Sequence, residues 1–224
     1  IQQIMTDGDL VFETTHRTKH GECIPVEINA SKITFQGETA VLSIVRDIST
    51  RKEHERALEE SERRYRSLFD SNPAVIWEED FSEMRAFLDG LADEVPDLET
   101  YMEDNPAAVE EMLDKIQIID VSQQAVERYG ATSKDHLIDN LQELFTQQAY
   151  VANAEIGMRI QAGERHFRVE TETETFDGRH LDEIIDVNVP EAYADHLSRV
   201  YLTVTDITER KAHERELQSV TERL

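Results

Sequence analysis

Apolar and polar positions follow two different periods along this chain, and the change from one period to the other occurs twice. Residues 40–45 and 200–204 are apolar runs rich in β-branched residues, which predicts buried strands. After each run, the seam positions recur at steps of three and four, the spacing of a helix with one packed face. Residues 45–58 return as 204–217 at a constant offset of 159 positions. The chain therefore contains a duplicated unit that ends a sheet and begins a helix.

Hydroxyl-bearing residues stand where each strand meets its helix. Ser49, Thr50 and Thr208 can accept hydrogen bonds from the unpaired N–H groups of a helix start, and residues 50–53 have the spacing of a capping box. The helices themselves carry a short, partly apolar coiled-coil seam, which predicts a homodimer through the linker helices. The seam positions are His54, Leu58, Ser61, Tyr65 and Leu68 in the first copy and His213, Leu217, Val220 and Leu224 in the second.

The order of strand, Asp-Ile-Ser or Asp-Ile-Thr, Arg-Lys and charged helix resembles the C-terminal edge of a PAS/PAC sensory domain with its signalling helix. The resemblance implies an α+β fold, the PAS fold, with a five-stranded antiparallel sheet and flanking helices. It also implies that the junction passes a change in the sheet into the helix. The residues assigned to this signal transfer are Asp47, Ser49, Thr50, Asp206, Ile207 and Thr208.

The same resemblance divides the chain into four segments. These are the C-terminal half of a PAS domain (1–50), a linker signalling helix (51–68), a complete PAS domain with a helical insertion at about 81–116 (69–207), and the start of an output helix (208–224). A helix end is expected at 1–5, and a long helix over the sheet at 149–163. Strands are expected at 10–17, 24–32, 39–47, 74–80, 118–121, 167–176, 181–189 and 199–206. Because the chain starts at Ile1 without Met, we interpret it as a fragment.

The complete domain offers a candidate ligand pocket. Trp77, Phe145, Met158 and Phe167 fall on elements that line the interior of PAS domains, where family members often hold a small molecule. The alternative is that these side chains only fill the core. Ser122 stands where the family usually has Asn. The neighbouring Glu78-Glu79 pair is interpreted as part of a solvated acidic face.

The sequence argues against flavin and haem, and no other cofactor is identified. Cys23, the only cysteine, lies beside a hairpin turn and outside the Asn-Cys-Arg-Phe motif of flavin-binding relatives, and the helix at 149–163 contains no histidine. The histidines lack metal-ligand spacing, and His54 and His213 lie outside a histidine-kinase context. Because no ATP-binding segment, nucleophile elbow or phosphate loop is found, the chain is not expected to be an enzyme.

The charge of the chain restricts its environment and its partners. Forty-eight Asp and Glu against 23 Lys and Arg give a net charge of -25. Such self-repulsion is relieved at molar salt, where the screening length falls to about 3 Å, so we favour a halophile's cytoplasm over an acidic docking surface. Acidic residues interleave with periodic apolar ones, which argues against disorder. Direct nucleic-acid binding is excluded by the lack of a basic patch, and no apolar run has the length of a membrane span.

Three functions remain open at this point. The first is a cytoplasmic sensory PAS module that acts on a downstream signalling domain, as in a halophilic archaeal sensor histidine kinase of a two-component system or a transducer-like protein. The second is a ligand-free PAS dimerisation scaffold. The third is the regulatory region of a histidine kinase or nucleotide cyclase whose catalytic domain lies outside this chain. The stimulus, the output domain and the oligomeric state are left unspecified.

Overall fold

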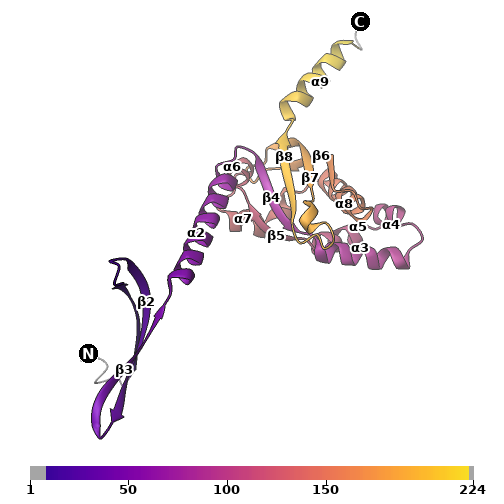
Figure 1. Cartoon of the computed structure of the whole chain (residues 1–224). Helices are drawn as coiled ribbons and strands as arrows, with labels where there is room; N and C mark the ends of the chain where they lie inside the picture. The colour runs from indigo at the N-terminus through magenta and orange to yellow at the C-terminus, as the bar shows by residue number, and fades with distance from the viewer. Residues whose placement is uncertain (1–8, 222–224) are drawn as a thin grey trace. The chain divides into compact units, whose positions relative to one another are not determined.

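A computed structural model describes residues 9–221 of the chain, with side chains described through residue 217. The chain divides into two units, residues 1–66 and 67–224, each of which is described by itself (Figure 1). The helix end predicted at 1–5 lies outside the described residues. The side chains of Val220 and Leu224, the last predicted seam positions, lie outside them too.

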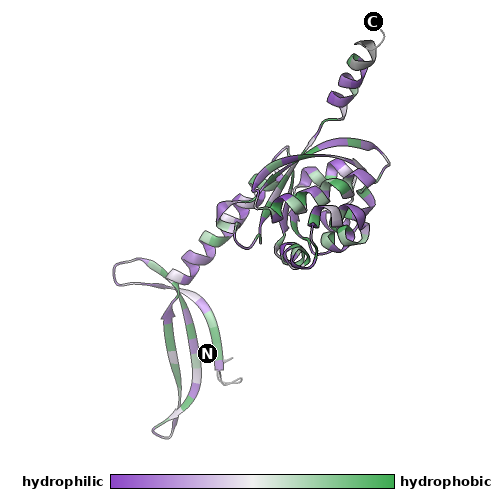
Figure 2. Ribbon diagram, turned by 90° about the vertical axis from the view of Figure 1, so that its right-hand side faces the viewer, coloured by the Kyte–Doolittle hydropathy of each residue, from purple (hydrophilic) through white to green (hydrophobic). Residues whose placement is uncertain are grey.

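The first unit contains a three-stranded antiparallel sheet in the order β1-β2-β3. The strands are β1 (Asp9–Arg17), β2 (Cys23–Phe35) and β3 (Glu38–Asp47), which confirms all three predicted strands and extends the second one. Figure 2 shows hydrophobic and polar residues alternating along them. Several apolar side chains of this sheet remain exposed in the described structure: Val11, Phe12, Phe35, Leu42, Ile44 and Val45. Helix α2 (Ser49–Asp70) follows directly.

The second unit is built on a five-stranded antiparallel sheet in the order β5-β4-β8-β7-β6. Its strands are β4 (Val75–Asp80), β5 (Gln117–Val121), β6 (His166–Glu174), β7 (His180–Asn188) and β8 (Val200–Asp206). The last strand in the sequence therefore lies in the middle of the sheet, between β4 and β7. This position brings the end of β8 into contact with the core of the unit.

Three helices occupy the predicted insertion between β4 and β5, namely α3 (Ser82–Glu94), α4 (Leu98–Asp104) and α5 (Pro106–Leu113). They are followed by α6 (Gln123–Tyr129), α7 (Lys134–Asp139), the 3-10 helix η1 (Leu141–Leu144) and α8 (Gln147–Gln161); a second 3-10 turn, η2 (Glu191–Tyr193), precedes β8. Helix α8 packs on β6, with α3 and α5 against it (Figure 1). A Cβ built on Gly157 of α8 would lie 2.6 Å from Met112 Sδ, so the lack of a side chain allows this close approach.

Apolar side chains from the sheet and from these helices form one core in the second unit, including Trp77, Leu88, Met112 and Ile156. Ser122 is buried in this unit and ties the sheet together, because its Oγ accepts the N–H of Ile76 and donates to the carbonyl of Ala74. The five-stranded antiparallel sheet with its flanking and inserted helices confirms the predicted fold class.

Helix α9 (Thr208–Thr221) leaves the end of β8. Among the described residues, no helix combines the length and the apolar character that crossing a bilayer requires.

Candidate functional site

The junction between β8 and α9 is held by three backbone-centred hydrogen bonds. Asp206 Oδ1 accepts the N–H of Thr208 at 2.9 Å, and the buried Ile207 donates its N–H to the carbonyl of Asp182 at 2.8 Å. Thr208 Oγ1 in turn accepts the N–H of Asp182 at 3.0 Å. Partial burial acts to raise the pKa of Asp206, but the hydrogen bonds from Thr208, together with the nearby charges of Arg128 and Arg179, lower that pKa. The end of β8, the start of α9 and the start of β7 are thus fixed together.

The predicted role of the Thr208 hydroxyl as helix cap was wrong. The carboxylate of Asp206 reaches the free N–H at the helix start, which leaves the hydroxyl of Thr208 to bond β7. The first unit follows the same rule, since Asp47 Oδ1 accepts the N–H of Ser49 at 2.8 Å. Helix α2 begins at Ser49, so Thr50 lies inside the first turn; its exposed side chain forms no hydrogen bond within residues 9–221.

An Arg-Lys pair then binds each helix start to a strand farther along the sheet. In the first unit, Lys52 Nζ lies 2.8 Å from Glu13 Oε2 on β1, and Arg51 Nη2 lies 2.6 Å from Glu13 Oε1. Hydrogen bonding to Lys52 lowers the pKa of Glu13. We call this contact the cation clamp.

The second unit repeats the cation clamp with the equivalent residues of the repeat. Lys211 Nζ lies 2.8 Å from Glu170 Oε2 on β6, and Arg210 Nη2 lies 3.7 Å from Glu170 Oε1. Hydrogen bonding to Glu170 raises the pKa of Lys211. The duplicated Arg-Lys of the sequence therefore performs the same structural task twice.

Asp182 adds a contact that the first unit lacks. Its buried carboxylate lies 3.2 Å from Arg215 and 3.6 Å from Lys211. The equivalent residue in β2 is Pro25, whose carbonyl accepts the N–H of Ile48 at 3.1 Å but which has no carboxylate.

Glu172, His180 and Asp182 place their ligand atoms within 4.8 Å of one another, a proximity that sequence spacing did not indicate. Because Arg215 and Lys211 already neutralise Asp182, we assign this carboxylate to the junction and not to a metal site.

Two adjacent cavities lie between the sheet and the helices of the second unit. The outer cavity has a volume of about 500 Å³ and the inner one about 60 Å³. Glu79, Leu141, Phe145 and Asn153 line both of them. We call the two cavities together the recess, and residues of η1 and of the loop after α5 line its larger part.

The structure brings together two of the four predicted pocket residues. Trp77 lines the inner cavity and Phe145 lines both cavities. Met158 instead faces a separate groove between α8, α4 and α5, and Phe167 is buried with its ring 4.2 Å from the guanidinium of Arg159. Met158 lies on a different face of α8 from Ala149 and Asn153, which line the recess. Phe167 shares its face of β6 with Thr171 and Thr173 but lies nearer the start of the strand.

The prediction that Glu78 and Glu79 form a solvated face was wrong. Glu78 is buried in an ion pair with Arg199 on one face of β4. Glu79 points to the other face, where it is 6% exposed and desolvation raises its pKa to about 8. The alternation of β4 held the signal that was missed, because Glu79 shares its face with Trp77.

A second buried carboxyl connects the recess to the junction. Glu183 lines the inner cavity and accepts hydrogen bonds from Tyr129 at 3.1 Å and from Thr173 at 2.7 Å. Burial raises the pKa of Glu183 and of Tyr129. On β7, Glu183 follows Asp182 directly and pairs with Asp206 of β8. One residue thus faces the cavity while its neighbours in sequence and in register hold the junction.

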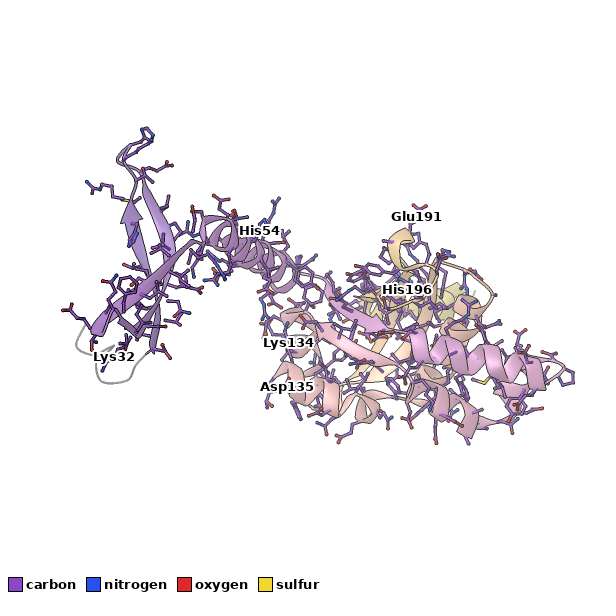
Figure 3. All side chains as sticks on the ribbon, turned by 60° about the horizontal axis from the view of Figure 1, so that its bottom comes forward. Lys32, His54, Lys134, Asp135, Glu191 and His196 are labelled. Carbon is purple, nitrogen blue, oxygen red and sulfur yellow. The ribbon has the colours of Figure 1, made fainter. Side chains whose placement is uncertain are left out.

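The entry of α2 into the second unit has its own anchor. Lys134, at the start of α7, lies 2.8 Å from Asp70 at the end of α2 and 2.9 Å from Asp120 of β5 (Figure 3). Partial burial acts to lower the pKa of Lys134, but its hydrogen bonds with these two carboxylates raise it. His54 lies on α2 within the first unit and is not among the residues that line the cavities described above (Figure 3).

Comparison with known proteins gives the following similarities. A family model described as PAS domain matches residues 1–50. Among solved structures, the chain is similar to the PAS domain of an HTR-like protein from Haloarcula marismortui, with 18% identity over 70% of this chain and 99% of that chain and a TM-score of 0.41.

Two further solved structures are similar. A domain of a sensory box sensor histidine kinase/response regulator from Geobacter sulfurreducens has 15% identity over 66% of this chain and 96% of that chain, with a TM-score of 0.41. The PAS domain of BvgS from Bordetella pertussis has 13% identity over 72% of this chain and 98% of that chain, with a TM-score of 0.37. No curated protein matches.

Proposed function

We propose that this chain, whose residues 1–50 belong to the PAS domain family, is the sensory part of a cytoplasmic signal-transduction protein and has no enzymatic activity of its own. The second unit senses a small molecule in its interior recess. It passes the resulting shift of β7 and β8 through Asp206, Ile207 and Thr208 into α9. Asp47 and Ser49 perform the corresponding task between β3 and α2.

One observation carries this proposal. Glu183 faces the inner cavity, whereas its neighbour Asp182 bonds Ile207 and Thr208. A ligand that displaces β7 at Glu183 therefore changes hydrogen bonds at the first turn of α9. Two arrangements of this packed junction are enough to transmit a signal, provided that the ligand favours one of them.

The test uses hydrogen–deuterium exchange of the full chain and needs no ligand. Thr173→Val removes the hydroxyl that bonds Glu183, so we expect faster or slower exchange of the amides in the first turn of α9. Thr203→Val is the matched control, because Thr203 lies on β8 facing away from Leu202 and Val204, which line the inner cavity. In a background with Asp206→Ala and Thr208→Ala, the effect of Thr173→Val on α9 should disappear.

Two outcomes would contradict coupling between the inner cavity and α9. If the Thr173 and Thr203 variants change α9 to the same extent, or if the effect survives loss of Asp206 and Thr208, the junction does not transmit changes from the cavity.

A ligand-free dimerisation scaffold is the second candidate function, and the exposed seam of α2 favours it. Leu58 and Leu68 are 63% and 65% exposed in the single chain. Pairing of two α2 helices would cover both. Sedimentation equilibrium should give a dimer that Leu58→Glu converts to monomer, whereas Ala57→Glu, one position off the seam, should leave the dimer intact. A monomer at all concentrations would remove this candidate.

The regulatory region of a histidine kinase or nucleotide cyclase is compatible with the first proposal. In that case the catalytic domain belongs to another part of the protein.

A further inference from the structure

Among the described residues, the recess of the second unit is lined by acidic side chains and by no basic ones. Four carboxyl groups line the outer cavity, from Glu79, Asp114, Asp139 and Glu143, and none of the described residues that line it is Lys, Arg or His. The remaining lining is largely apolar and includes Leu113, Ile118 and Phe145. A negative rim over apolar walls favours a molecule that carries both a positive charge and a hydrocarbon part.

Two buried polar groups point into this recess without a partner. The Glu79 side chain, 6% exposed, makes no hydrogen bond or ion pair within residues 9–221, although it lines both cavities. Thr171 Oγ1, which lines the inner cavity, is buried and lacks a partner as well. Buried polar atoms are nearly always hydrogen-bonded in folded proteins. Thr171 Oγ1 is such an exception, and the carboxyl group of Glu79 faces the same recess, so a molecule bound there could supply partners to both.

We propose that this recess binds a small organic cation, an amine with a short apolar chain, whose ammonium group pairs with Glu79 while its hydrocarbon part contacts Leu113, Ile118 and Phe145. This inference rests on the proposed sensory function and names its ligand class. A carboxylate ligand would meet the four carboxyl groups of the outer cavity, and a neutral ligand would form no ion pair with Glu79.

Binding of the cation should displace a proton. Burial raises the pKa of Glu79 to about 8, so the empty site holds a neutral carboxyl group at neutral pH. The ammonium group pairs with the carboxylate, and the carboxyl proton passes to the buffer as the ion pair forms. The other titratable groups facing the recess are Asp114 after α5, Asp139 of α7, Glu143 of η1, Glu183 of β7 and Tyr129 of α6. Burial raises the pKa of Tyr129 well above its ordinary value, which leaves its phenol neutral.

The experiment compares three probes of equal chain length in isothermal titration calorimetry with the full chain. n-Hexylamine, n-hexanol and n-hexanoate each contain six carbons and differ in the end group, which is positive, neutral or negative at neutral pH. At neutral pH we expect hexylamine to bind about tenfold more tightly than hexanol and hexanoate not to bind. The heat measured in buffers of different ionisation enthalpy should show release of about one proton per hexylamine bound.

Two variants connect the result to Glu79. Glu79→Gln should weaken hexylamine binding about tenfold and abolish proton release while leaving hexanol binding unchanged. Glu111→Gln makes the same substitution at an exposed position of α5 outside the recess and should change neither hexylamine binding nor proton release.

Failure of the inference can be told apart from failure of the proposed function. Equal affinity for the three probes, or hexylamine binding that Glu79→Gln leaves unchanged, would overturn the cation preference but leave an interior ligand site. No binding of any probe would overturn the inference as well. Whether sensing then fails too is decided by the exchange of α9 in the Thr173→Val variant, which requires no ligand.

Discussion

Replacing Glu79 with Gln should stabilise the second unit at neutral pH, although the substitution removes no clash and fills no cavity. The carboxyl has an ordinary pKa of 4.5 in the unfolded chain and a pKa of about 8 in the folded one. Its contribution to stability is therefore fully present below pH 4.5 and is lost as pH rises to about 8. At about 1.4 kcal/mol per pH unit, roughly 3 kcal/mol is lost at neutral pH. Gln, which stays neutral, avoids this loss.

The assay is urea unfolding of the full chain between about pH 5.5 and pH 8. Trp77 is the only tryptophan and lies on β4, so its fluorescence reports the second unit alone. The stability difference between Glu79→Gln and the unaltered chain should grow by about 1.4 kcal/mol per pH unit. Glu183 is present in both proteins, so its own titration cancels in the difference.

Glu111→Gln serves as the control and should follow the unaltered chain at every pH. A difference between Glu79→Gln and the unaltered chain that stays constant across the pH range would mean that Glu79 titrates near its ordinary value. The reasoning from its burial would then be refuted.

Three further results are expected. Gly157→Ala should lower the free energy of unfolding, measured by Trp77 fluorescence, by about 1 kcal/mol, because overpacking against Met112 costs about 1–3 kcal/mol and the higher helix propensity of Ala regains about 1 kcal/mol. A Met112→Val background should reduce this cost. An equal cost in both backgrounds would contradict the contact between Gly157 and Met112. The thermal midpoint should rise between about 0.1 M and about 1 M KCl, because salt screens a net charge of -25, and a midpoint that falls would argue against self-repulsion. Lys211→Met should speed amide exchange in the first turn of α9, because it breaks the ion pair with Glu170. Lys115→Met, between α5 and β5, should leave this exchange unchanged. Identical exchange in the two variants would mean that the cation clamp does not stabilise the start of α9.

The strands and their order of appearance could be predicted because alternation with a period of two survives in the sequence even at a high acidic content. Helix α8 was predictable because its apolar positions recur with a period near 3.6 residues. The positions of Met158 and Phe167 relative to the recess were not predictable, since they depend on which face of α8 and which end of β6 meet the recess. That choice is made by packing between distant segments, which one sequence does not specify.

The acidic residues were the main source of error, because nearly every one of them in so charged a chain is solvated. Glu79 departs from this rule since β4 lies between two other strands. The acidic partners in the cation clamp were missed for another reason. Glu13 and Glu170 are 157 positions apart, whereas the junctions are 159 apart, so a comparison at one constant offset does not align them. The two hairpin glycines, Gly21 and Gly178, share the offset of 157 and adopt positive φ angles of 87° and 80°.

The start of α2 meets Pro25 where the start of α9 meets Asp182, so detaching the two helices costs different amounts of free energy. Detaching α9 separates the buried carboxylate of Asp182 from Arg215 and Lys211 and leaves a charge with no counter-ion. Detaching α2 exposes the neutral carbonyl of Pro25 and separates Arg51 from Glu13 and Glu27, whose carboxylates already keep part of their surface in solvent. Under the proposed function, we therefore expect the upstream helix to loosen under a weaker stimulus than the downstream helix. We infer from this difference that the two copies of the junction respond at two thresholds along a single chain.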